Sequence, residues 1–317
     1  MPHQVETMAF AGQVPWHGLG TALEEADFYD WQSTCRKAGL DWKAERVPLL
    51  TADKQERVAR FAVRRTSDGH ILGTVGPKYT LLQNQDAFQW FNPFLEAREA
   101  ALHTAGSLAE GSRIWVLAKL NREPLVIAEG DAVEKFILLS HSHDGSLAVR
   151  VGFTPVRVVC ANTLAMAHGS DAGKLIRVKH SRSVHDNLEN IREVMDLANA
   201  EFEATAEQYR LLAHKDINQA DLRKYVRRVF KLDEDKDVSG RMRNILDDVA
   251  RLTEAGVGND LPSVRGTWWA AYNGVTDYLS HEYGRNESNR LNSLWFGENA
   301  RVNRHALDTA LEMALAV

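Results

Sequence analysis

The chain has 317 residues, of which 44% are hydrophobic and 26% charged, and its formal net charge is −5. This composition is ordinary for a folded protein, and the negative net charge excludes a nucleic-acid binder that is basic throughout. No apolar run approaches the roughly 18 to 20 residues that span a bilayer. The first residues also lack the basic and apolar regions of a signal peptide, so we expect a cytoplasmic protein without a membrane segment.

The N-terminal part predicts helices around a β-hairpin. The expected elements are a helix over 30–39, hairpin strands over 58–66 and 70–82, and a helix over 84–103. Gly39 stands where a helix commonly ends, and Asp68-Gly69 is a strong signal for a tight turn. Asn84 is the expected N-terminal cap of the last helix, and Pro93 should kink or split it.

The central part predicts an antiparallel meander. The expected elements are strands over 112–120, 135–141, 146–153 and 156–160, then a short helix over 162–169. Asp144-Gly145 supplies a turn between two of the strands. Thr154-Pro155 marks a bulge or bend, because proline cannot donate a hydrogen bond within a sheet. This order differs from the alternating strand and helix pattern of a parallel sheet.

The C-terminal part is mainly helical. The expected helices cover 183–214, 219–230, 266–282 and 289–317, with loops over 232–240 and 256–263. We therefore predict an α+β fold, with antiparallel β-hairpins and a β-meander packed with helices, followed by a mainly helical C-terminal region. The expected domains are an α+β core over 1–215 and a helical region over 216–317.

Charge is distributed unevenly after the meander. Between Val149 and Ser183 there are six basic residues and one acid, Asp171, whereas 184–215 carries seven acids and three basic residues. One interpretation is that the two segments neutralise each other within one molecule. The other is that the basic segment faces a polyanion.

Basic residues are also interleaved with aromatic ones. Lys78 precedes Tyr79, and Arg113 alternates with Trp115, so the latter two share a face of a strand. Positive grooves with stacking residues bind single-stranded nucleic acid without reading its sequence. Alternatively, the arginines lie on a solvated sheet face and Trp115 lies in the core. The candidate DNA-binding residues are Lys78, Tyr79, Arg113, Trp115, Arg150, Arg157, Lys174, Arg177, Lys179 and Arg182, with Tyr79 and Trp115 as the stacking candidates.

Arg150 and Arg157 share a face only under one condition. They are seven positions apart, so a regular strand places them on opposite faces of the sheet. A bulge at Thr154-Pro155 would shift the alternation by one residue and return both to one face. A common basic row therefore requires that bulge.

The sequence contains only weak signals for a catalytic, metal-binding or phosphate-binding site. His141 and His143 could share a metal ion on one strand face, although no third ligand is evident and histidines at a hairpin end are usually solvated. His17, between glycines, reads either as a phosphate-binding loop or as a rigid loop that docks Trp16. The two cysteines, Cys35 and Cys160, read as buried thiols. No nucleotide-binding loop or hydrolase motif is present, so we expect no catalytic residue, metal or cofactor.

Several segments resemble the phage/plasmid-like protein family, whose central domain is of unknown function. The segments are PWHGLGT (15–21), GSRIWVLAKL (111–120), ILLSHSHDGSLAVRV (137–151), VRVVCANTL (156–164), GTWWAAYNGVTDYLSHE (266–282) and LWFG (294–297). The order of elements is also similar to that of phage single-strand annealing recombinases of the RecT and Erf type. That resemblance implies ATP-independent annealing, assembly into rings or filaments, and single-stranded DNA held in a basic groove along the sheet.

The leading expectation is thus a phage or plasmid DNA-binding protein that anneals single strands and forms homo-oligomers. Two alternatives stay open. One is a metal-dependent enzyme acting on nucleic acid or nucleotides through His141, His143 and His17. The other is a non-enzymatic protein that binds a host protein through the acidic helix 184–214 and the aromatic C-terminal helix.

Overall fold

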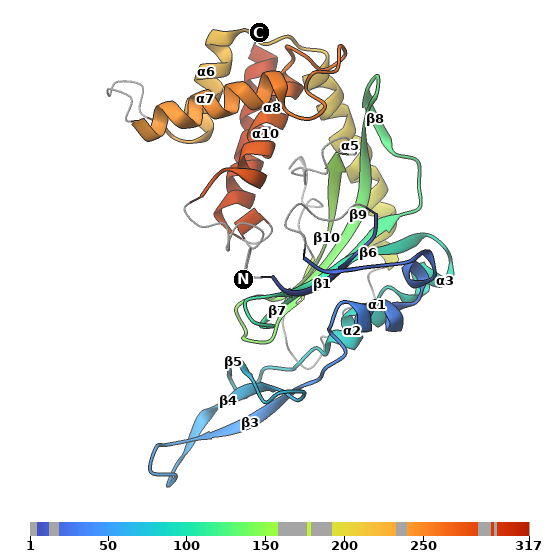
Figure 1. Cartoon of the computed structure of the whole chain (residues 1–317), viewed down its shortest axis with the longest axis vertical. Coiled ribbons are helices and arrows are strands. Elements are labelled where there is room, and N and C mark those ends of the chain that lie inside the picture. Colours follow the sequence, from blue (N-terminus) through green and yellow to red (C-terminus); the bar gives the residue numbers. More distant parts are fainter. Residues whose placement is uncertain are drawn as a thin grey trace. The chain divides into compact units, whose positions relative to one another are not determined.

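The computed structural model describes residues 5–12, 19–157, 176–178, 192–232, 240–284, 293–294 and 297–316. They form two compact units, whose elements are labelled in Figure 1. Unit 1 holds the described residues of Met1–Arg122, Phe136–Phe153 and Lys174–Asp196, and unit 2 holds those of Glu123–Lys135, Thr154–Gly173 and Leu197–Val317. No helix of the described ranges has both the length and the apolar character needed to cross a bilayer.

Most of unit 1 is one large sheet with the strand order β2-β1-β6-β7-β9-β10-β11. The strands are β1 (Val5–Phe10), β2 (Thr21–Ala22), β6 (Ala100–Leu108), β7 (Arg113–Leu120), β9 (Asp131–Ser142), β10 (Val149–Arg157) and β11 (Ile176–Val178). The pairs β1–β6, β6–β7, β7–β9 and β10–β11 are antiparallel, and β1–β2 is parallel. The predicted antiparallel meander is therefore confirmed, and β1, β2, β6 and β11 extend the sheet beyond the predicted strands.

Short helices accompany this sheet: η2 (Glu25–Tyr29), α1 (Trp31–Lys37), α2 (Asn84–Gln89) and α3 (Asn92–Glu96). The predicted helix over 30–39 corresponds to α1. The Asp30 side chain caps α1 by accepting hydrogen bonds from the backbone N–H groups of Gln32 and Ser33. Gly39 follows the helix with φ of +67°, a conformation that glycine adopts without strain.

The predicted helix over 84–103 is too long. Pro93 does split it, because this residue lies at the start of α3. The chain then turns at Arg98, whose φ is +56°, and residues from Ala100 onward form β6. The cap is also different. Gln83 and Asp86 form a capping box for α2, while Asn84 is fully buried and donates from Nδ2 to the Leu40 carbonyl.

A separate three-stranded antiparallel sheet consists of β3 (Ala44–Leu50), β4 (Arg57–Arg65) and β5 (Ile71–Val75). It contains the predicted hairpin, whose turn ends at Gly69 with φ of +76°. β3 was not predicted. Its Pro48 is compatible with an edge strand, because the missing N–H group can face solvent there.

Unit 2 is mainly helical, which confirms the predicted fold class. Its helices are α5 (Arg192–Ala213, in this unit from Leu197), α6 (Gln219–Val229), α7 (Gly240–Ala255), α8 (Trp268–His281) and α10 (Glu298–Ala316). Helix α7 was not predicted. The N-terminal parts of the predicted helices over 183–214 and 289–317, and the predicted helix over 162–169, fall largely outside the described residues.

A hairpin from the middle of the chain completes unit 2. Strand β8 (Leu125–Ala128) pairs with the first residues of β9. The buried Asp131 side chain accepts a 2.7 Å hydrogen bond from Trp269 Nε1, and Lys135 Nζ lies 3.3 Å from Glu203 on α5. These contacts explain why the division differs from the predicted boundary at 215/216. The hairpin and most of α5 belong with the C-terminal helices.

Aromatic side chains fill the core of unit 2. Trp268, Trp269, Tyr209, Tyr225 and Tyr272 are each at most 1% exposed. The rings of Tyr209 and Trp269 lie 4.8 Å apart, and the Tyr225 hydroxyl donates to a carbonyl of α10. Buried tyrosines usually find such a partner. The aromatic residues of α8 are therefore core residues and do not supply the exposed surface that a host-protein contact was expected to use.

Candidate nucleic-acid interface

Three of the candidate residues lie around one turn of unit 1, at residues 142–147. Arg113 is paired with Ser142 across β7 and β9, and its Nε lies 3.3 Å from Ser146 Oγ. The Tyr79 hydroxyl donates a 2.5 Å hydrogen bond to the Ser142 carbonyl. Lys78, next to Tyr79, is exposed. The turn thus brings Lys78, Tyr79 and Arg113 together from two distant segments.

Tyr79 is held in place by this turn. Gly145 has φ of +77°, and a Cβ there would lie 3.7 Å from the Tyr79 ring, in ordinary contact. Burial raises the pKa of the Tyr79 hydroxyl above its usual range, and the Asp144 carboxylate raises it further. The phenol therefore stays protonated as a hydrogen-bond donor at neutral pH. Its role in this structure is to anchor the turn, while the ring remains half-exposed.

Trp115 does not take the predicted stacking role. Its ring is 1% exposed and packs so closely on β6 that a Cβ on Gly106 would lie 2.4 Å from it. A ring without accessible surface cannot stack on a base, so this prediction is wrong. The alternative interpretation, which placed Trp115 in the core, is confirmed.

Arg150 lies next to a second cationic position of the sheet. The register of β10 and β11 pairs the Cα atoms of Arg150 and Arg177 directly. The Arg150 side chain is half-buried. Like charges at directly opposite positions of an antiparallel pair destabilise the sheet unless a counter-charge compensates them. The register therefore places two of the candidate residues at neighbouring positions of the sheet.

Burial along β10 does not decide whether the expected bulge at Thr154-Pro155 is present. Val149 and Val151 are buried, but Gly152 is buried as well and Phe153 is only half-buried, so burial does not alternate regularly before Thr154. A common face for Arg150 and Arg157 stays a prediction. The other members of the predicted basic segment, Lys174, Lys179 and Arg182, lie outside the described residues.

The two histidines of the metal hypothesis are buried, and the expectation that they are solvated is wrong. His141 and His143 are at most 1% exposed, with ring centroids 4.9 Å apart. Asn84 donates from Nδ2 to Leu40, so its Oδ1 accepts, and His143 Nε2, at 2.9 Å, carries the proton. The Nε2 atom of His143 is therefore not available to ligate a metal. Within the described ranges, no group of three or more His, Cys, Asp or Glu side chains is placed to hold an ion.

The structure describes only some of the remaining motif residues. Cys35 is buried, as expected, and burial raises the pKa of its thiol to about 12. His17, Trp16 and Cys160 lie outside the described residues. Gly20, with φ of +106°, approaches the Met8 side chain so closely that a Cβ would lie 2.6 Å away. Gly20 therefore lets the backbone of this segment lie close against β1.

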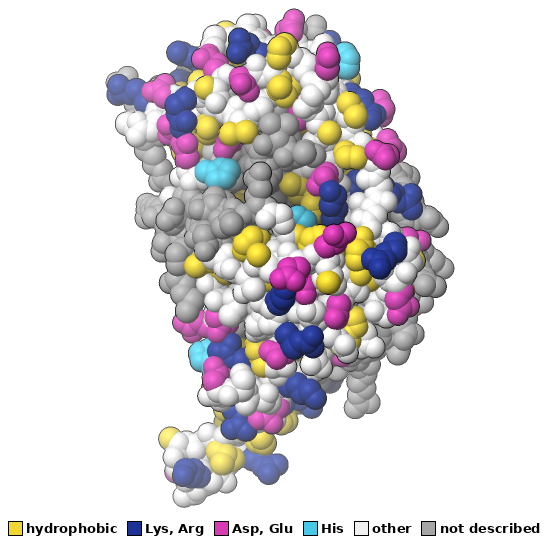
Figure 2. Space-filling view, turned by 45° about the vertical axis from the view of Figure 1, so that its right-hand side comes forward, with side chains coloured by type: hydrophobic (Ala, Val, Ile, Leu, Met, Phe, Trp, Pro, Cys, Tyr) yellow, Lys and Arg dark blue, Asp and Glu magenta, His cyan; other side chains and the backbone are white. Residues whose placement is uncertain are grey.

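Sequence reasoning overlooked a cationic row on α6. Lys224, Arg227, Arg228 and Lys231 recur every three or four residues, a spacing that places them along one side of a helix. This spacing was readable in the sequence. On the face of the molecule in Figure 2, basic and acidic side chains are interspersed, and they do not form one uniformly basic surface.

Comparison with known proteins identifies a family without an assigned activity. A family model described as "Domain of unknown function (DUF932)" matches residues 71–295. The comparison with curated proteins and the comparison with solved structures gave no match.

Proposed function

Because the chain belongs to the DUF932 family, whose description names no activity, we propose its function from its own residues: it is a phage- or plasmid-type protein that binds single-stranded DNA and anneals complementary strands. Annealing requires neither ATP nor covalent catalysis. The protein acts in the cytoplasm as a homo-oligomer, a ring or filament that lines up many binding sites along a strand. The proposal combines the charge pattern of the chain with the resemblance to annealing recombinases.

The pairing of Arg150 with Arg177 is the observation that carries this proposal. This register brings two cationic residues to neighbouring positions of one sheet, where both can contact the phosphate groups of a bound strand. Lys78 and Arg113, around the 142–147 turn, add two further cationic side chains in the same unit. All four positions are in a chain whose net charge is −5, so the positive charge is local.

The mechanism is electrostatic. Lysine and arginine side chains that neutralise phosphates release condensed counterions, which provides most of the free energy of sequence-independent binding. Contacts to the backbone leave the base edges free to pair with a second strand. The same physics makes binding weaker as the salt concentration rises, with a slope of about −0.7 in log K against log salt for each phosphate contact on a single strand.

The decisive experiment follows the annealing of two complementary, dye-labelled oligonucleotides without ATP over a series of salt concentrations. We expect the protein to accelerate annealing at low salt and to lose this effect as salt rises. Absence of acceleration, together with absence of single-strand binding at low salt, would refute the proposal.

A matched pair of variants connects the activity to the sheet. Arg150→Gln removes one member of the opposed pair, and we expect it to weaken single-strand binding and to reduce the salt slope by about 0.7. Arg122→Gln removes the same charge from an exposed position between β7 and β8, and should leave both quantities unchanged. Equal effects of the two variants would show that only net charge matters and that the arginine pair is not a binding position.

A further inference from the structure

The small sheet of unit 1 narrows to two strands at its far end. Strand β5 pairs with Phe61–Arg64 of β4, whereas β3 and β4 continue to pair as far as Leu50 and Arg57. Residues 52–60 are all exposed, and Figure 1 shows this end of β3 and β4 extending beyond β5. A two-stranded hairpin is only marginally stable by itself in water, so a binding partner would stabilise this end of the sheet.

One face of the small sheet is covered at its base and uncovered at its end. Paired residues share a face, and residues alternate between the two faces along a strand. One face therefore holds these pairs of β3 and β4 residues: Ala44 with Arg65, Arg46 with Val63, Pro48 with Phe61, and Leu50 with Arg57. Ala44, Val63 and Arg65 are buried, whereas Arg46 and Arg57 are exposed. We call the uncovered part, formed by Arg46, Pro48, Leu50, Arg57 and Phe61, the ribbon face.

The ribbon face is continuous with the cationic positions around the 142–147 turn. Arg46 Nη1 donates hydrogen bonds to the carbonyls of Pro77 and Tyr79, at 3.1 and 3.0 Å. These two bonds hold the short segment that carries the exposed Lys78. Arg46 therefore connects the ribbon face to Lys78 and Tyr79, two of the residues that the sequence predicted to contact DNA.

No acid neutralises the two arginines of the ribbon face. Arg46 contacts neutral groups, which are the two carbonyls and the Phe61 ring, whose centroid lies 4.9 Å from the guanidinium carbon. Arg57 makes no side-chain hydrogen bond or ion pair within the described part of the chain. The structure describes every residue from 43 to 80, so the surroundings of both arginines within the small sheet are known.

The acids of this region lie beside the ribbon face or at its ends. Glu45 is on the opposite face and pairs there with Arg64 at 2.6 Å. Asp53 and Glu56 belong to the turn that joins β3 and β4, where Asp53 accepts hydrogen bonds from other turn residues. Asp144 lies near Tyr79, at the base of the sheet. These acids bound the ribbon face at both ends and do not interrupt it.

The dimensions of the ribbon face suit an extended anion. From Arg46 to Leu50, the partner of Arg57, β3 spans about 14 Å at 3.4 Å per residue. This length corresponds to about four nucleotides of one strand at 3.4 Å each. The half-exposed Phe61 ring lies between the two arginine positions, and single strands are held by such combinations of basic and aromatic side chains. Arginines on an exposed ribbon also prevent edge-to-edge pairing of sheets, but this role does not require them to share a face with the ring.

We propose that the ribbon face binds the phosphate backbone of single-stranded DNA and extends the contact from Lys78 along the small sheet. This assignment rests on the proposed function, because annealing requires the protein to hold a strand while its bases stay free. It adds Arg46, Arg57 and Phe61, which the sequence did not predict, to the residues that contact DNA.

The test compares the full-length protein with the double variant Arg46→Gln and Arg57→Gln. Arg57→Gln is also measured alone. The single variant breaks no bond within the described residues, so its effect reports the loss of a direct contact. Arg46→Gln, by contrast, also weakens the bonds that hold the segment of Lys78. Circular dichroism and thermal melting establish that all variants are folded.

The matched control is the double variant Arg60→Gln and Arg64→Gln. It removes the same charge from the same sheet, but these side chains bond within the sheet, Arg60 to Thr74 and Arg64 to Glu45.

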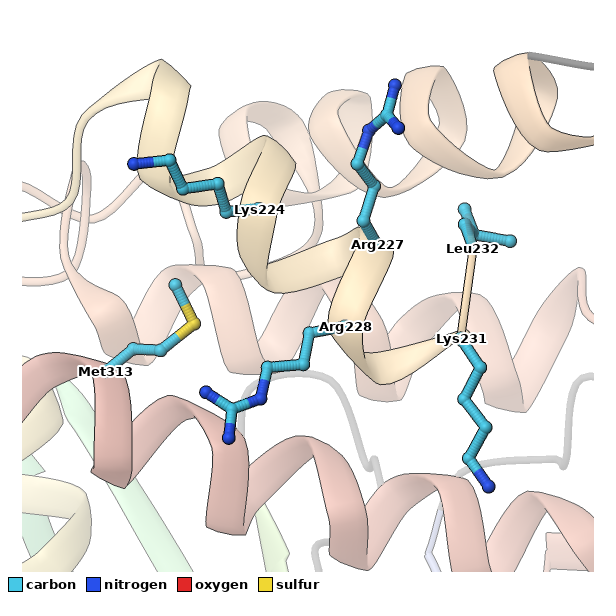
Figure 3. Close-up of a pocket in the computed structure, with 6 residues that line it drawn as sticks. All are labelled: Lys224, Arg227, Arg228, Lys231, Leu232 and Met313. Carbon is cyan, nitrogen blue, oxygen red and sulfur yellow. The ribbon is translucent and has the colours of Figure 1, made fainter. Parts of the chain in front are cut away.

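A second control, Lys231→Gln, removes a cation from unit 2. Lys231 follows α6, and the side chains of Lys224, Arg227 and Lys231 point in different directions there (Figure 3).

Binding of a dye-labelled thymidine 30-mer is measured by fluorescence anisotropy over a salt series. Loss of two phosphate contacts should lower the salt slope by about 1.4 and the affinity by about 25-fold at 0.1 M salt. Arg57→Gln alone should lower the slope by about 0.7 and the affinity by about 5-fold, and both controls should match the wild type. An unchanged slope in the Arg46 and Arg57 double variant would overturn the assignment, as would an equal loss in the matched control.

Light scattering tests the other possible occupant, a second copy of the chain. If the Arg46 and Arg57 double variant changes the oligomeric state and leaves the salt slope unchanged, the ribbon face contacts another copy and the DNA assignment is overturned.

The outcome can be separated from that of the proposed function. Annealing of complementary strands is measured on the same proteins. If the wild type binds the 30-mer through the ribbon face but does not accelerate annealing, the proposed annealing activity fails and the ribbon assignment stands. If the wild type anneals and the Arg46 and Arg57 double variant binds and anneals equally well, the ribbon assignment alone fails.

Discussion

The close crossing of α7 and α8 at Gly274 offers a quantitative test of the fold of unit 2. A Cβ at this position would lie 2.4 Å from Thr253 Oγ1 and 2.8 Å from the Thr253 backbone nitrogen. The hydroxyl is itself held by a 2.8 Å hydrogen bond to the Val249 carbonyl. Because one of the two clashes is with backbone, a side-chain rotation cannot relieve it, and the Gly274→Ala variant must move α7 away from α8.

The magnitude follows from two opposing effects. Overpacking a well-packed interior costs about 1 to 3 kcal/mol. Replacing glycine by alanine within a helix stabilises the fold by up to about 1 kcal/mol, because alanine has the higher helix propensity. We therefore expect Gly274→Ala to lower the free energy of unfolding by about 1 to 2 kcal/mol, which corresponds to a fall in Tm of about 2 to 8 °C for a unit of this size.

Gly240→Ala is the matched control for this variant. Gly240 is the first residue of α7, and a Cβ there meets no atom within 4 Å. This variant should be stabilised by about 0.4 to 1 kcal/mol, because alanine restricts the unfolded chain. Urea unfolding followed by the helical circular dichroism signal measures both. If Gly274→Ala were as stable as Gly240→Ala, the close approach of the two helices would be refuted.

Three further predictions concern unit 1. Burial alone would raise the pKa of Asp27, but hydrogen bonds, the largest from Lys37, lower this pKa overall. The ionised carboxylate therefore stabilises the fold above about pH 4, and this stabilisation is lost as the pH falls through the folded pKa. Asp27→Asn should therefore be less stable than the wild type at pH 7 in urea unfolding, and the difference should shrink at pH 3; a difference independent of pH would contradict this. In a Cys160→Ser background, the buried Cys35 thiol should react with a thiol reagent at pH 8 only after unfolding, and rapid labelling of the folded protein would disprove its burial. Tyr79→Phe should lower the free energy of unfolding by about 1 kcal/mol through loss of its hydrogen bond, whereas an unchanged melting temperature would show that this bond contributes nothing.

Elements with strong local signals were predictable from the sequence. Asp30 and Gly39 bound α1, and an Asp-Gly turn connects β4 and β5. Strand β3 was missed because Pro48 disfavours a central strand, and only the sheet order shows that β3 is an edge. The end of the helix predicted over 84–103 was misplaced, since its last residues were assigned by helical periodicity although they pair with β7.

The candidate site was less predictable, because it depends on which face of each strand is covered. The sequence places Arg113 and Trp115 on one face of β7, but it does not show that nearly the whole strand is buried. Strands covered on both faces lose the alternation that identifies an exposed side. The pairing of Arg150 with Arg177 depends on strand register, which no local pattern determines.

The β8–β9 hairpin has a consequence for how the protein is made. Asp131 and its partner Trp269 are 138 residues apart, so at about 5 to 20 residues per second a ribosome needs roughly 7 to 30 s to deliver the second after the first. During that interval Leu125 and Ile127, which are buried in the finished fold, have no C-terminal helices to cover them. During synthesis, the hairpin therefore exposes apolar side chains until the C-terminal helices have been made and can cover it. A protein shortened at residue 215 would remain in that state permanently, so separating the two units by simple truncation should yield aggregation-prone material.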